Sequence, residues 1–118
     1  MPVFAALIYE TGNRPEPTAP DFLDYIGGYN AFGEIAGAAI TGGCPLSGPE
    51  TATTIEVTGG QQGDVVLTDG PFAETKEWLG GFYLLEAEDL DGAIALARHI
   101  PAAWRDGGKV EVRPAWAM

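Results

Sequence analysis

The sequence predicts an α+β fold of the ferredoxin-like type, with an antiparallel sheet and two helices on one face. Three observations support this. The segments with strand and helix character follow one another as β, α, β, β, β, α, β. Two of the strand segments are apolar on both faces, and only two segments have helix character. The 118 residues suffice for one core, and with no repeat or linker we expect a single domain over residues 1–118.

The first strand is expected at residues 3–9, VFAALIY, which is apolar on both faces and therefore should be covered from both sides. A Pro-rich loop at 12–20 follows, and Pro20 and Asp21 favour the start of a helix that extends to about Ala39. Apolar residues recur there at helical spacing, namely Phe22, Ile26, Tyr29, Phe32 (or Gly33) and Ala36.

The same helical segment contains four glycines, at positions 27, 28, 33 and 37. A glycine inside a helix costs about 0.5–1 kcal/mol relative to alanine. Either the helix is bent, or another part of the backbone approaches it closely at these positions.

The remaining elements alternate between strands and one helix. Residues 41–49 are expected to form a loop or an irregular edge. The strands are expected at 51–59, 65–68, 82–87 and 109–116, and the second helix at 87–100. Leu90, Ala93, Ile94 and Ala97 would form the buried stripe of this helix, and Pro101 would end it.

Two helices cover one face of such a sheet and leave the other face bare. Because residues 3–9 and 82–87 are apolar on both faces, that second face also needs a cover. With no third layer in the chain, a second copy packed sheet to sheet is the economical solution. We therefore expect a homodimer.

Composition narrows the choice of partners and compartment. Six Lys and Arg stand against 17 Asp and Glu, which gives a net charge of −11 and argues against binding to nucleic acid or to an anionic membrane surface. The single cysteine, Cys44, excludes an intrachain disulfide and fits a reducing compartment. The first eight residues are apolar but lack a basic start and are too short to span a bilayer, so a cytoplasmic protein is expected.

The stretch DGPFAETKEWLGG at 69–81 contains the densest set of candidate site residues. Its Asp-Gly-Pro start favours a rigid turn. In one interpretation the turn folds Phe72 onto the core. In the other it forms the wall of a ligand pocket and directs Asp69, Glu74 or Lys76 at the ligand.

Other candidates lie outside or at the end of this turn. Glu74 and Glu77 could form an acid/base pair, although an exposed charged hairpin explains them as well. Tyr9 and Tyr83 could point into the space between the sheet and a partner. Arg113, on a strand, could hold a ligand carboxylate or pair with Glu56 or Glu111.

Several kinds of chemistry lack support in the sequence. His99 is the only histidine and fits a solvent-facing helix end, and Cys44 has no neighbouring histidine. One His and one Cys do not make a common metal site, and no Gly-rich phosphate or dinucleotide motif is present. We therefore expect neither a metal nor a cofactor.

The block DGPFAETKEWLGGFYLL, with TATTIEVTGG before it and VEVRPAW after it, closely resembles the DGPF branch of the YCII-related domain proteins. This resemblance implies a ferredoxin-like fold of the dimeric α+β barrel type in a bacterial protein. Some relatives resemble small cofactor-free enzymes built around a His and an Asp, one lineage being implicated in dehydrochlorination. Their histidine lies in the first helix, whereas residues 21–39 here contain none. The resemblance also implies an association with extracytoplasmic-function sigma factors.

Two hypotheses about function follow. In the first, a small aromatic or anionic metabolite binds in a cleft at the dimer seam, with Asp69 or Glu74 moving protons. Its lining would include Phe72, Lys76, Tyr83, Arg113 and Tyr9. In the second, the protein is a non-catalytic module whose acidic surface engages a sigma factor.

Overall fold

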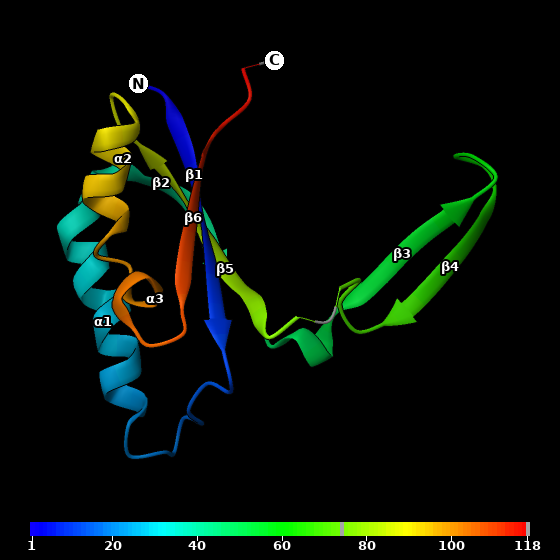
Figure 1. Ribbon diagram of the computed structural model, residues 1–118, viewed down its shortest axis with the longest axis horizontal. Helices are drawn as coiled ribbons and strands as arrows, with labels where there is room; N and C mark the ends of the chain where they lie inside the picture. The colour runs from blue at the N-terminus through cyan, green and yellow to red at the C-terminus, as the bar shows by residue number, and fades with distance from the viewer. Residues whose placement is uncertain (74, 118) are drawn as a thin grey trace.

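The computed structural model describes residues 1–73 and 75–117, and Figure 1 shows their arrangement. The strands are β1 (Val3–Thr11), β2 (Ile40–Pro45), β3 (Thr53–Thr58), β4 (Asp64–Asp69), β5 (Glu77–Glu86) and β6 (Lys109–Pro114). The helices are α1 (Phe22–Ala36), α2 (Leu90–Ala97) and α3 (Pro101–Trp104), with short 3-10 turns at Gly37–Ala39 and Pro49–Thr51.

Four of the strands form one antiparallel sheet in the order β2-β5-β1-β6, and the three helices lie on one of its faces (Figure 1). Without β3 and β4, the chain runs βαββαβ in the strand order of a ferredoxin-like fold. The predicted fold class is therefore confirmed.

The details differ from the prediction at three places. The irregular edge expected at 41–49 is β2, whose register against β5 shifts between Ile40 and Gly42, so this segment supplies the edge strand of the main sheet. The strands expected at 51–59 and 65–68 are present, but they pair with each other in a separate two-stranded sheet. The second helix, expected at 87–100 with Pro101 as its end, is α2 and stops at Ala97; Pro101 instead opens α3, because a proline is well tolerated at the first helical position.

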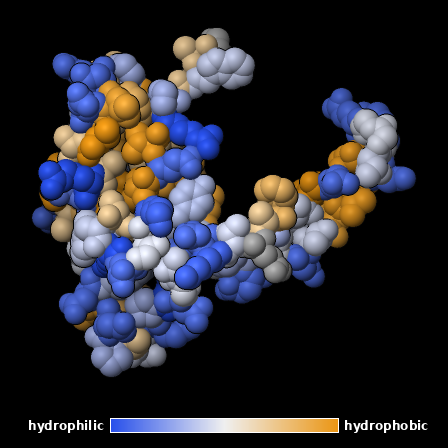
Figure 2. Space-filling model, in the orientation of Figure 1, coloured by the Kyte–Doolittle hydropathy of each residue, from blue (hydrophilic) through white to orange (hydrophobic). Residues whose placement is uncertain are grey.

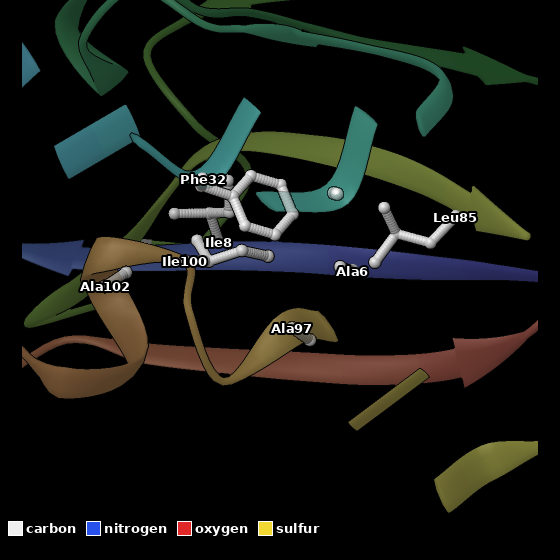
Figure 3. Packing of buried hydrophobic residues seen from close by; sticks show 8 residues of the cluster. Ala6, Ile8, Phe32, Leu85, Ala97, Ile100 and Ala102 are labelled. Atoms are coloured by element: carbon white, nitrogen blue, oxygen red, sulfur yellow. The ribbon is translucent and has the colours of Figure 1, made fainter. Parts of the chain in front are cut away.

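The core fills the space between the helices and the sheet (Figure 3). Phe32 of α1 is fully buried, and its ring centroid lies 4.8 Å from that of Tyr83 on β5. Ala93 and Ala97 of α2 are buried as predicted, but Leu90 and Ile94 remain about half exposed. The expected stripe was too wide, because only its two small residues fit against the sheet.

The opposite face of the sheet carries no helix among the described residues (Figure 1). Along β1 the side chains alternate: Phe4, Ala6 and Ile8 are buried under the helices, and the odd-numbered residues are only half buried on the other face. We call this second face the open face, and the strand register places residues of β5 and β6 on it beside those of β1. The residues of these three strands on the open face include Ala5, Leu7, Tyr9, Leu79, Phe82, Leu84, Lys109, Glu111 and Arg113.

The hairpin β3–β4 projects away from the rest of the molecule (Figure 1), and we call it the arm. Its strands pair from Thr53 with Asp69 to Thr58 with Asp64. No helix of the described residues is long and apolar enough to cross a membrane.

The glycines of α1 have different roles. A Cβ on Gly28 would lie 2.8 Å from the ring of Pro101 and 3.0 Å from Arg105 Nη2, so α3 approaches the helix closely here. Gly37 ends the helix with φ of 51°, a conformation that favours glycine. A Cβ on Gly27 would meet no atom within 4 Å.

These contacts predict opposite effects for two adjacent substitutions. Gly27→Ala should raise the free energy of unfolding by about 0.5–1 kcal/mol, because it removes backbone freedom from the unfolded chain. Gly28→Ala should lower it by about 1–3 kcal/mol, because the rigid proline ring must move. Urea denaturation of both variants measures this, and equal effects would contradict the packing of α3 on α1.

Candidate functional site

A cavity of about 420 Å³ lies between α1 and the sheet. Its helix side is formed by residues one turn apart, because positions three and four apart share a face of α1. Phe22, Tyr25, Ile26, Tyr29 and Asn30 line that side. The sheet side is lined by Ile8, Gly43, Cys44, Pro45, Gly80, Phe82 and Tyr83, and Arg14 closes one end.

Glu10 is the acceptor at the centre of a polar cluster at this cavity. Its Oε1 accepts hydrogen bonds from the hydroxyls of Tyr25 and Tyr29, the second at 3.3 Å. Its Oε2 accepts from Arg14 Nε at 3.1 Å. Two tyrosine hydroxyls and a guanidinium thus converge on one carboxylate, which fixes the positions of all four side chains.

Arg14 also ties together segments that are far apart in the chain. Its Nη1 donates to the carbonyl oxygen of Leu46, and its Nη2 donates to that of Gly80 at 2.6 Å. The guanidinium lies over the ring of Trp78, 5.0 Å from the centroid. A Cβ on Gly80 would collide with the Glu10 carboxylate, so the first glycine of the LGG sequence makes room for the cluster.

Arg105 supports the same two tyrosines from outside the cavity. Its guanidinium lies 4.6 Å from the ring centroid of Tyr25 and 5.7 Å from that of Tyr29, and its Nη2 donates to the Tyr25 carbonyl oxygen at 2.7 Å. These contacts fix the first half of α1 against the segment after α3.

Burial and the Glu10 carboxylate both raise the pKa of Tyr25 and Tyr29. The pKa of Tyr25 lies above the ordinary value of 10.0, because burial disfavours the phenolate and Glu10 accepts the phenolic hydrogen bond and repels the negative charge. The pKa of Tyr29 is raised further, again chiefly by burial and then by Glu10. Burial alone raises the pKa of Tyr83. Burial acts to lower the pKa of Arg14, but Glu10 and Tyr25 outweigh it and the pKa is raised.

The predicted site residues do not form one group. Tyr83 lines the cavity under α1: its partner across the strands is the buried Ala6, so it faces the helices and not the open face, and the expected orientation was wrong. Tyr9 and Phe72 line a second, broad hollow of about 990 Å³ at the base of the arm. Asp69 and Lys76 are exposed near this hollow, and Glu74 lies outside the described residues.

Arg113 is separate from both hollows. Its Nε lies 2.6 Å from Glu111 Oε2, so it takes one of the two structural partners considered for it. Both are on the open face, where Arg113 lies across from Ala5 on β1. Glu77, considered as an acid/base partner of Glu74, lies 3.9 Å from Lys109 Nζ on the same face.

Sequence reasoning missed the cluster around Glu10. Glu10, Arg14 and Tyr25 come from the end of β1, a loop and α1, and no short motif connects them. One signal was available: the tyrosines at 25 and 29 are four residues apart, so their hydroxyls share one face of the helix.

The described residues contain no group of three or more His, Cys, Asp or Glu side chains that could hold a metal ion. Cys44 is exposed on the edge strand, and His99 is exposed just after α2.

The chain belongs to the YCII-related domain family, whose model matches residues 3–118. It is also similar to an uncharacterised protein of Rhizobium meliloti (strain 1021), with 50% identity over 52 residues. That match covers 44% of this chain and 42% of the relative, so the match spans less than half of either protein. Neither comparison assigns an activity.

Glu10→Gln should lower the pKa of Tyr25 and Tyr29, because the Glu10 carboxylate accepts their hydrogen bonds and repels their phenolate forms. The pKa of Tyr83 should not change, because only burial raises it. Since the folded pKa values exceed the unfolded value of 10.0, their stabilising contribution is complete below about pH 10 and is lost as pH rises through the folded values. An NMR titration with ring-labelled tyrosine resolves the residues. Equal pKa values of Tyr25 in the two proteins would contradict the described cluster.

Proposed function

We propose that this YCII-related protein binds a small, uncharged compound with an aromatic ring in the cavity under α1. The observation that carries the proposal is the combination of aromatic and aliphatic walls with one convergent polar cluster. A cavity of about 420 Å³ falls within the range of about 300–1,000 Å³ that is typical of small-molecule sites. The sequence DGPF at 69–72 supports placing the chain in the DGPF branch of its family.

The walls suit a flat apolar body. Phe22, Ile26 and Ile8 supply apolar contact, and Tyr83 presents its ring beside them. Aromatic rings gain about 0.5–1.5 kcal/mol per offset or edge-to-face contact beyond the burial of area. A ligand with a single ring therefore fits the cavity better than an aliphatic chain does.

The polar end favours an uncharged ligand over an anion. Arg14 is already paired with Glu10 and donates to two backbone carbonyl oxygens, so these partners inside the protein compete with any ligand anion for its guanidinium. A ligand carboxylate placed there would be repelled by the negative charge of Glu10, which lies behind Arg14, Tyr25 and Tyr29. A phenolic or alcoholic hydroxyl could instead donate to Glu10 or accept from Tyr29, whose present bond is long at 3.3 Å.

The geometry favours binding without catalysis at Asp69. This residue is exposed at the base of the arm, outside both walls of the cavity, and lacks the apolar enclosure that would keep a carboxyl protonated for acid chemistry. Glu10 lies behind the lining residues Arg14, Tyr25 and Tyr29 and bonds to all three, so it is the position at which proton transfer should be tested if turnover is observed.

The second candidate function is a partner-binding module for an extracytoplasmic-function sigma factor. The net charge of −11 favours this, since a basic segment of a regulatory protein would be attracted to the acidic surface. In that case the cavity would have no role in recognition, and substitutions inside it would leave partner capture unchanged.

Ligand binding is tested with two tryptophan substitutions on α1, one at a position that lines the cavity and one at an exposed position outside the lining. Ile26→Trp should fill the cavity, whereas Leu23→Trp places the same side chain where the native one is 75% exposed. Phenol, as the uncharged probe, should raise the thermal midpoint of the wild type and of Leu23→Trp but not of Ile26→Trp. Benzoate, as the anionic probe of similar size, should have a smaller effect.

Equal phenol shifts in all three proteins would contradict the location of the site. Absence of a shift in the wild type for phenol and other uncharged aromatic compounds would contradict the proposal itself. Capture of a sigma factor that is unaffected by Ile26→Trp would then support the second function.

A further inference from the structure

We infer that Asn30 is a specificity-determining residue of the cavity under α1, and that the ligand is a phenol with an uncharged carbonyl group para to its hydroxyl. The phenolic hydroxyl would lie at Tyr29, and the carbonyl group would bond to Asn30 at the mouth of the cavity. The inference rests on the proposed function, because it specifies the ligand class of the same cavity.

The mouth of this cavity lies between α1 and the edge strand β2. Most of the residues that line the cavity are buried or half-buried. The exposed ones come from these two elements, and they are Asn30, Gly43, Cys44 and Pro45. A ligand therefore enters between Asn30 on the helix and the residues of β2.

Asn30 supplies a side-chain amide to this mouth, and an amide both donates and accepts hydrogen bonds. The hydroxyls of Tyr25 and Tyr29 bond to Glu10, whereas no described residue forms a hydrogen bond with the Asn30 side chain. A polar group of the ligand can therefore bond to the Asn30 amide without displacing a partner within the protein.

The strand across the mouth from Asn30 also offers polar groups. Among the described strands β2 pairs with β5 alone, so it is an edge of the sheet. Every second residue of an edge strand directs its backbone N–H and C=O groups away from the sheet. The mouth can therefore hold a polar group between the Asn30 amide and the backbone of β2.

The distance across the sheet favours a para-substituted ring over phenol. Tyr25 and Tyr29 form one row of α1 and bond to Glu10 on β1, and Ile26 and Asn30 belong to the neighbouring row. Because β5 lies between β1 and β2, these two strands are about 9–10 Å apart. A second polar group para to the hydroxyl extends the ligand from Tyr29 towards the mouth.

The surroundings of Asn30 disfavour an anionic substituent. Glu34 is exposed one helical turn beyond Asn30 and would repel a carboxylate at the mouth. Acidic residues outnumber basic ones by 17 to 6 in the chain, and Figure 2 shows a mostly hydrophilic surface around the start of α1, at the bottom of the view. A ketone or amide carbonyl avoids the repulsion and still accepts a hydrogen bond from Asn30.

Two ligands of nearly equal size test the inference. The first, para-hydroxyacetophenone, has a carbonyl group where para-ethylphenol has a methylene group. NMR titration gives both dissociation constants. Their ratio should shift by about two- to ten-fold in favour of para-ethylphenol in Asn30→Ala, because one hydrogen bond is lost. Alanine is the better helix former, so this variant keeps α1.

Asn13→Ala is the matched control, because Asn13 is the other asparagine of the chain, is exposed and lies outside the cavity lining. Its ratio of dissociation constants should equal that of the wild type. Cys44 gives a second readout, since this single cysteine is exposed at the mouth. Saturating para-hydroxyacetophenone should slow its reaction with a thiol reagent more than saturating phenol does.

An unchanged ratio in Asn30→Ala would overturn the inference, and phenol binding to the wild type would still support the proposed function. Absence of binding by all three phenols would contradict both. Equal protection of Cys44 by para-hydroxyacetophenone and phenol would contradict the placement of the carbonyl group at the mouth. Tighter binding of para-(2-aminoethyl)phenol, the cationic probe, than of para-hydroxyacetophenone would contradict the choice of an uncharged substituent.

Discussion

The placement of all three helices on one face of the sheet is the constraint on which the rest of this structure depends. A sheet whose central strands are apolar on both sides needs two covers, and the described chain supplies one. The covered side encloses the core around Phe32 and, beside it, the cavity under α1. The other side of the sheet carries no helix of the described residues, so a single arrangement of helices determines both where the cavity lies and which face of the sheet is open.

The strand β5 connects these two sides. Its inward residues Tyr83 and Leu85 contact the core, and Tyr83 also lines the cavity. Its outward residues Phe82 and Leu84 belong to the open face, where they lie beside Leu7 and Ala5 of β1. The bulge at Gly80 adds room for Glu10 and Arg14. A ligand in the cavity and a partner on the open face would therefore both act on this strand, from opposite sides.

Sequence patterns predicted the elements whose burial is regular. The continuous apolar run of β1 and the helical spacing from Phe22 to Ala36 reflect direct packing on the core, so the apolar pattern revealed both elements. The edge strand β2 was less evident, because Gly42 and Gly43 interrupt any alternation. The cluster of Glu10 with Arg14 and Tyr25 could not be predicted, since it depends on the bulge in β5 and on the docking of α1. The DGPF turn drew attention to the arm, but the hydroxyl and carboxylate groups converge elsewhere.

Hydrogen–deuterium exchange of the wild-type protein tests most directly the expected homodimer, in which a second copy covers the open face and the arm, because it needs no substitution. In a lone chain the amides of residues 53–69 are close to solvent and would exchange within the shortest labelling time. Covered by a second copy, they should be protected, together with those of the open-face strand β5, and dilution should remove the protection of the arm. Rapid exchange of the arm at every protein concentration would contradict the account.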